Sequence, residues 1–165
     1  MEYPFSGDVV VHAVARARAK QVEWLLATVL GYQVPLQWQL QSQVPHALKT
    51  AFSWQGDENF GPELASALAG WKEIYFEVIQ FPNEHSGGSI WLYTPDLGIK
   101  HRAIDAIGNY LIGENELRAA MTKSSNAAGL SWEIENLLAT EWDQVLDPLR
   151  SQADLPIEAK NYRVG

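Results

Sequence analysis

The chain contains no cysteine in its 165 residues. Disulfide bonds, cysteine-ligated zinc, iron–sulfur clusters and thiol nucleophiles are therefore excluded. No window approaches the run of about 18 apolar residues that a membrane-spanning helix requires, and residues 1–8 lack the basic segment and apolar run of a secretory signal. We therefore expect a cytoplasmic protein with no membrane partner.

Basic residues are few: the chain has 12 Lys and Arg but 20 Asp and Glu, which gives a formal net charge of −8. Neutralising phosphates takes a cluster of basic residues, so we expect no nucleic-acid partner. Binding of single-stranded RNA is set aside as well, since Leu48–Trp54 lacks the aromatic and basic pattern of a base-stacking strand. The chain also has no glycine-rich phosphate loop and no closely spaced histidine pair. The sequence thus predicts no metal and no cofactor.

The composition is that of a globular protein, with 47% hydrophobic and 19% charged residues. A chain of this length buries about 70% of its unfolded surface, so residues 1–165 are expected to form a single α+β domain. Residues 1–82 predict the order strand, helix, strand, strand, helix, strand, which is typical of a ferredoxin-like βαββαβ sandwich. The expected strands are 7–14, 35–41, 48–54 and 73–81; the expected helices are 15–32 and a short one from Pro62.

The rest of the chain is expected to extend this sandwich. Residues 89–112 predict additional antiparallel strands, because Pro95–Gly98 has the Pro and Gly placement of a reversing turn. Residues 114–165 predict C-terminal helices and a tail. A long helix is expected at 130–146, and 151–165 form the tail. The later helices would cover the open face of the sheet.

Two histidines and one carboxylate are candidates for a pocket. His12 lies in the first strand, whereas His101 and Asp105 share one face of the strand after the Pro95 turn. On a straight strand these two lie roughly 13 Å apart, so a catalytic pairing needs a third group. The candidate pocket therefore joins five residues: His12, Tyr93, His101, Asp105 and Asn109. The alternative is structural, with His12 hydrogen-bonded in the core and Asp105 capping its turn.

Arg16, Arg18 and Lys20 gather at the amino end of the first helix. Backbone N–H groups and the helix dipole make such an end attractive to anions. These three residues are a candidate anion site; the alternative is a solvated basic face.

Five segments carry a resemblance to a known family: VEWLL (22–26), FSWQG (52–56), LASALAGW (64–71), YTPDLGIKH (93–101) and GNYLIGENELRAA (108–120). They resemble an uncharacterised actinobacterial family, domain of unknown function number 3145. The resemblance implies an actinobacterial cytoplasmic protein and brings no activity with it.

Two functions stay open. The first is a non-enzymatic module that binds a small molecule or a protein, since seven tryptophans suit cores and interfaces alike. A homodimer formed through the sheet edge would be one such protein complex. The alternative is an enzyme that uses the His and Asp pocket for acid and base chemistry.

Overall fold

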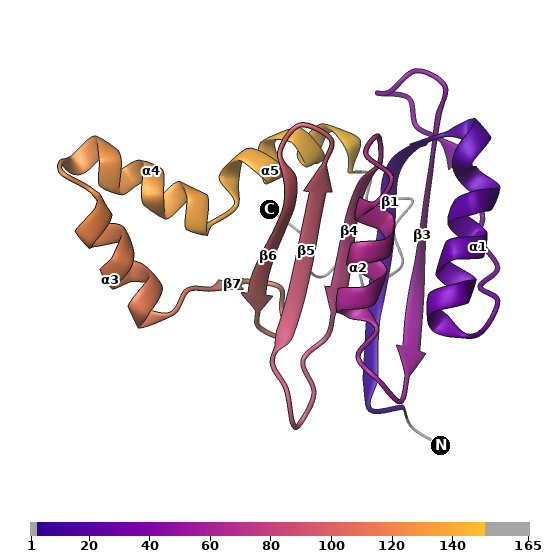
Figure 1. The fold of residues 1–165 in the computed structure, drawn as a ribbon, viewed down its shortest axis with the longest axis horizontal. Helices are drawn as coiled ribbons and strands as arrows, with labels where there is room; N and C mark the ends of the chain where they lie inside the picture. Colours follow the sequence, from indigo (N-terminus) through magenta and orange to yellow (C-terminus); the bar gives the residue numbers. More distant parts are fainter. Residues whose placement is uncertain (1–2, 151–165) are drawn as a thin grey trace.

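The structure, a computed structural model, describes residues 3–150 and confirms the α+β class (Figure 1). The described residues form one antiparallel sheet in the order β2-β3-β1-β4-β5-β6-β7. Its strands are β1 (Phe5–Ala15), β2 (Gln39–Leu40), β3 (Ala47–Gly56), β4 (Tyr75–Gln80), β5 (Gly88–Thr94), β6 (Gly98–Ile104) and β7 (Tyr110–Leu111). The α-helices are α1 (Ala19–Leu30), α2 (Gly61–Ala69), α3 (Glu114–Lys123), α4 (Ala127–Leu137) and α5 (Thr140–Leu146), with 3-10 helices η1 (Arg16–Arg18) and η2 (Asp147–Leu149). The predicted tail at 151–165 lies outside the described residues, and the finer ferredoxin-like assignment stays a prediction.

Strand β1 lies inside the sheet because it is apolar on both faces. It pairs antiparallel with β3 and with β4, and Val9 lies opposite both Phe52 and Val78. Side chains alternate along a strand, so Val9 and Val11 point to one face while Val10 and His12 point to the other. All four are buried.

Helices α1 and α2 cover one face of the sheet, called the helix face below. Leu26 of α1 and Leu64 of α2 pack with Val9, Trp54 and Phe76 in the larger hydrophobic cluster. Helix α1 ends at Gly31, whose φ of 77° lies in the left-handed region that glycine tolerates. Helix α1 lies on the β3 side of the sheet, α2 lies over β4, and the two helices contact each other (Figure 1).

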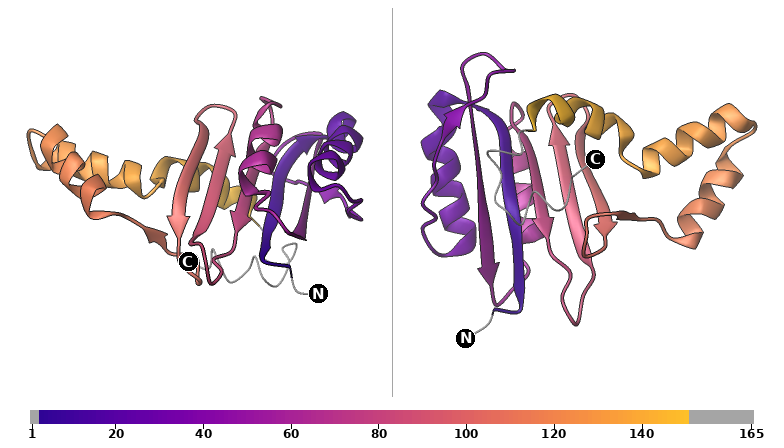
Figure 2. Two further views of the ribbon diagram at one scale, coloured as in Figure 1. Left: turned by 60° about the horizontal axis from the view of Figure 1, so that its bottom comes forward. Right: turned by 180° about the vertical axis from the view of Figure 1, so that it is seen from behind.

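Helix α5 and η2 cover the opposite face over β4, β5 and β6. Leu146 and Leu149 pack there against Ile79, Leu92 and Ile104 in a second cluster. The view from behind shows α5 crossing these strands on the side away from α2 (Figure 2). This part of the protein therefore has three layers.

Helices α3 and α4 form a hairpin, called the arm below, that projects beyond the β7 edge of the sheet (Figures 1 and 2). Ala120 is the only buried residue of these two helices. Arg102 of β6 holds the first turn of α3 by donating to both carboxylate oxygens of Glu116, at 2.8 and 3.1 Å. The arm therefore buries little apolar surface of its own.

Two predicted elements differ from the structure. Of the strand expected at 35–41, only β2 is formed, and its Leu40 is 67% exposed. The chain before it is irregular because Trp38 turns toward α1, where its indole donates to Glu23 at 2.7 Å. The helix expected at 130–146 breaks at Ala139, which has a left-handed φ of 54°. The break redirects the chain so that α4 stays in the arm while α5 packs on the sheet.

Candidate functional site

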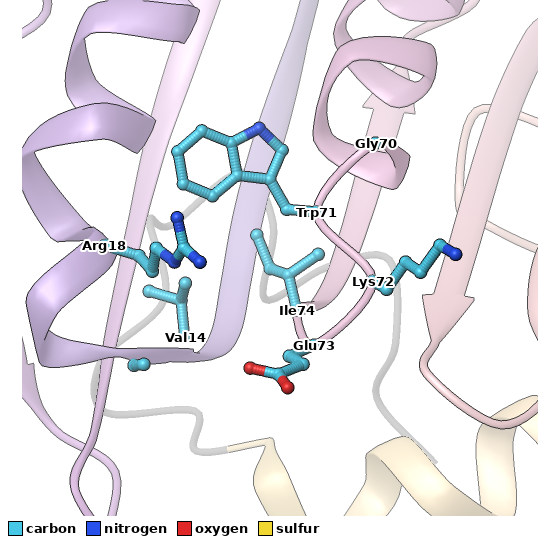
Figure 3. A pocket seen from close by; sticks show the side chains of 8 residues that line it. Val14, Arg18, Gly70, Trp71, Lys72, Glu73 and Ile74 are labelled. Atoms are coloured by element: carbon cyan, nitrogen blue, oxygen red, sulfur yellow. The ribbon is translucent and has the colours of Figure 1, made fainter.

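A cavity of about 380 Å³ opens where the end of β1 and η1 meet the loop after α2 (Figure 3). Val14 and Ile74 give it apolar walls, and Trp71 lines it with its indole ring. Arg18, Lys72 and Glu73 are its charged lining residues. The volume lies within the range of about 300 to 1,000 Å³ that small-molecule sites occupy.

Arg18 and Trp71 come from different elements and lean toward each other across this cavity (Figure 3). The Arg18 guanidinium carbon lies 5.6 Å from the centroid of the Trp71 ring, which is a cation–π contact. One Arg18 N–H donates to Gln21 at 3.2 Å. The loop that carries Trp71 is closed by backbone hydrogen bonds, from Trp71 N–H to Leu68 and from Ile74 N–H to Trp71, both 3.1 Å. These contacts hold the cation over the ring.

The charged groups are unevenly placed around the cavity. The Lys72 side chain points away from Arg18, whereas the Glu73 carboxylate lies at the end of the cavity beyond Ile74 (Figure 3). One cation and one carboxylate therefore face an apolar interior. Such a lining can bind and orient a small polar molecule.

The predicted anion site is brought only partly together. All three residues are exposed, but Arg18 lines the cavity whereas Arg16 and Lys20 do not. Trp71 and Glu73 were missed, because their approach to Arg18 depends on how α1 and α2 pack and leaves no signal in local sequence. Of the three residues of the candidate anion site, one therefore reaches the cavity, and the anion site itself stays a prediction.

The two histidines of the predicted pocket lie on opposite faces of the sheet. His12 hydrogen-bonds with Glu77 at 2.6 Å, and Glu77 lies opposite Leu92, on the face that α5 covers. His101 lies opposite Trp91, which packs against the helix-face cluster. Because Trp91 and Leu92 are consecutive, their side chains point to opposite faces. The expected shared pocket of His12 and His101 is therefore not formed.

His101 is exposed and lies on the part of the helix face that α2 leaves open. Its Nε2 hydrogen-bonds with the Ser89 hydroxyl at 3.0 Å, and its ring lies 4.9 Å from that of Trp91. Partial burial and the neighbouring charge of Arg102 lower the pKa of His101, which favours the neutral ring. Tyr93 lies on the same face but stacks on Phe76 at 5.2 Å within the core.

Asp105 and Asn109 are the two predicted pocket residues that do meet. The Asn109 side chain donates to Asp105 at 3.0 Å, and the backbone N–H groups of Ile107 and Asn109 donate to the same carboxylate. Desolvation opposes ionisation of Asp105, but these donors prevail and its pKa is lowered. This is the turn-capping arrangement that was the structural alternative.

His12 belongs to a buried network that fastens η2 to the sheet. Arg150 donates to Glu77 at 2.6 and 3.1 Å and to Asp143 at 2.8 Å. Burial by itself raises the pKa of Glu77, but the Arg150 charge and the His12 hydrogen bond outweigh it, so that pKa lies well below 4.5. Burial likewise lowers the pKa of Arg150, and the carboxylates of Glu77 and Asp143 raise it on balance. Glu77 and Arg150 therefore stay charged at neutral pH.

The described residues thus form an α+β fold with a cavity of small-molecule size beside Arg18 and Trp71. The chain belongs to the family described as Protein of unknown function (DUF3145), whose model matches residues 8–158. Neither the curated proteins nor the solved structures contain a match to it. None of the helices within residues 3–150 has the length and hydrophobicity needed to cross a membrane.

Proposed function

We propose that the chain is a non-enzymatic module that binds a small molecule carrying one anionic group in the Arg18 cavity. The observation that carries this proposal is the Arg18 guanidinium held over the Trp71 ring beside apolar walls. A guanidinium has five N–H donors in a planar fork that matches a carboxylate or phosphate. The bond to Gln21 uses one of them.

The surroundings of Arg18 favour an anion despite the net charge of −8 for the whole chain. Arg16 and Lys20 are exposed on either side of Arg18 in sequence and add positive potential outside the cavity. The amino end of α1 adds its partial positive charge. Glu73 opposes a second anionic group at the other end of the cavity. The ligand is therefore anionic at one end and neutral or positive at the other.

The proposal is tested by NMR titration of the full chain with acetate and with inorganic phosphate at constant ionic strength. We expect saturable shifts of the Trp71 indole N–H and the Arg18 Nε–H resonances. A charge-assisted hydrogen bond contributes about 1.5 to 3 kcal/mol, so Arg18→Ala is expected to weaken binding about tenfold or more.

Arg16→Ala is the matched control, since it removes the same charge two residues away without touching the cavity lining. It is expected to change the affinity by less than about twofold, because Arg16 does not line the cavity and salt screens a charge that makes no direct contact with the ligand. Equal losses in the two variants, or shifts that do not saturate, would contradict the proposal.

We further propose that the protein is located in the cytoplasm of an actinobacterium. The absence of cysteine supports a reducing compartment, and the resemblance in the five segments above supports the source. Fractionation of producing cells tests the location; recovery with the membrane or the medium would contradict it.

Protein binding is a second candidate function, favoured by the exposed apolar side chains of the arm. Leu117, Met121 and Trp132 are 41%, 66% and 58% exposed on helices that bury almost nothing. Such a surface favours a partner, and a second copy of the chain is the simplest one. Sedimentation over a range of concentrations should show a dimer that Met121→Glu dissociates. A strict monomer at every concentration would contradict pairing with a second copy.

A further inference from the structure

A second cavity, of about 580 Å³, lies at the other end of α1. Its lining residues come from the end of α1 and the segment just after it, from the end of β3, and from the loop that leads to α2. Aromatic residues from four separate segments line it: Tyr3, Tyr32 and Phe60, together with the buried Trp54. Tyr3 and Tyr32 are 44% and 40% exposed, so both rings are accessible to a ligand.

Two of these rings are fixed by their neighbours. The Tyr32 hydroxyl donates to the Gln55 carbonyl and accepts from the Gln55 N–H, both at 3.1 Å. Phe60 stands edge-on to the buried Trp54, with ring centroids 6.1 Å apart and planes at 74°. Because these two rings are already ordered, binding of a ligand would cost little conformational entropy.

The electrostatics of the cavity favour a positive charge. Asp57 and Glu58 line it with exposed carboxylates, and its described lining residues include no Lys or Arg. The carboxyl end of α1 has the negative end of the helix dipole, and the last turn contains no basic residue to offset it. Aromatic faces are themselves negative, so rings and carboxylates attract the same kind of ligand.

We propose that this cavity binds an organic cation, specifically a quaternary ammonium group enclosed by Tyr3, Tyr32 and Phe60. Cages of aromatic rings recognise such groups through cation–π attraction, and the adjacent carboxylates add long-range attraction. The site is independent of the Arg18 cavity, which lies at the opposite end of a 12-residue helix and thus about 18 Å away. A negative result at one cavity therefore leaves the proposal for the other cavity unaffected.

The test is an NMR titration with choline, compared with 3,3-dimethylbutan-1-ol, its neutral isostere of the same shape. We expect choline to shift the ring resonances of Tyr32 and Phe60 saturably and to bind at least about fivefold tighter than the isostere. Equal affinities would show a merely apolar hollow and overturn the proposal. The absence of saturable shifts at tens of millimolar choline would overturn it too.

Three variants locate the site. Tyr32→Leu removes a ring and is expected to weaken choline binding about fivefold or more, whereas Tyr32→Phe keeps the ring and should retain most of the affinity. The double variant Asp57→Asn, Glu58→Gln, at exposed positions that do not threaten folding, should weaken choline binding and leave the isostere unchanged. Unchanged choline affinity in this double variant would contradict the electrostatic part of the argument and with it the cation site.

Discussion

Replacing Glu77 by Gln removes the charge at the centre of the buried network while keeping nearly the same shape. Glu77 is 4% exposed and bonds His12 and Arg150, which is 11% exposed. Breaking a buried ion pair costs about 3 to 5 kcal/mol, because the remaining charge has lost its compensation. Total stabilities are about 5 to 15 kcal/mol, so the variant should stay folded but lose a large share of its stability.

Glu114→Gln is the matched control for this substitution. Glu114 pairs with Arg118 at 2.6 Å in the arm, but the two side chains are 75% and 72% exposed. Exposed pairs one helical turn apart contribute about 0.3 to 0.5 kcal/mol. The two substitutions are chemically identical, but Glu77 is buried and Glu114 is exposed. They are therefore expected to lower the free energy of unfolding by very different amounts.

Urea unfolding followed by tryptophan fluorescence at neutral pH measures both free energies of unfolding. We expect the Glu77→Gln variant to lose at least about 3 kcal/mol and the Glu114→Gln variant less than about 0.5 kcal/mol. Equal losses would refute the view that the Glu77 network fastens η2 to the sheet.

The pH dependence gives an independent check on the same network. The pKa of Glu77 in the folded protein lies well below 4.5, its ordinary value, so the folded state binds fewer protons than the unfolded state in this range. The stabilisation is then fully present above pH 4.5 and is lost as the pH falls through the folded pKa. The loss of stability below pH 4.5 should be shallower in Glu77→Gln than in the wild type; superimposable pH profiles would contradict this.

Three further outcomes are expected. Gly98→Ala should cost about 1 kcal/mol, or a Tm about 2 to 4 °C lower in a thermal scan, because Gly98 has a φ of 75°; an unchanged Tm would contradict this. Leu146→Ala should cost about 2 to 5 kcal/mol in urea, whereas Val145→Ala, 39% exposed, should stay within about 0.5 kcal/mol. The hydrogen bond from Arg102, followed by that from the Gly113 N–H, lowers the pKa of Glu116 to about 2. The stabilisation from this pair is therefore lost only as the pH falls from 4.5 through about 2, and a Glu116 carboxyl that titrates near 4.5 by NMR would contradict the contact.

Elements whose signal is local could be predicted from the sequence. The run of apolar residues around Val10 predicted β1, and the apolar stripe through Val22 and Leu26 predicted α1. Pro95 and Gly98 predicted the turn between β5 and β6, where Thr94 now lies opposite Gly98. In each case side-chain periodicity or backbone stereochemistry decides the conformation without help from distant residues.

Features set by distant contacts could not be predicted. Glu77 and Arg150 are 73 residues apart in sequence, and their pairing depends on α5 folding back over the sheet. That fold-back in turn requires the break at Ala139, which has neither Gly nor Pro to indicate it. The opposite placement of His12 and His101 likewise follows from strand register, which the alternation within one strand does not determine.

The proposed binding of a small anion beside Arg18 is tested most directly by equilibrium dialysis against a bacterial metabolite extract, with mass spectrometry of both chambers. The wild-type chain and Arg16→Ala should concentrate the same anionic metabolite, and Arg18→Ala should not. Enrichment of that metabolite by Arg18→Ala as well, or of no anion by the wild type, would contradict the proposed function.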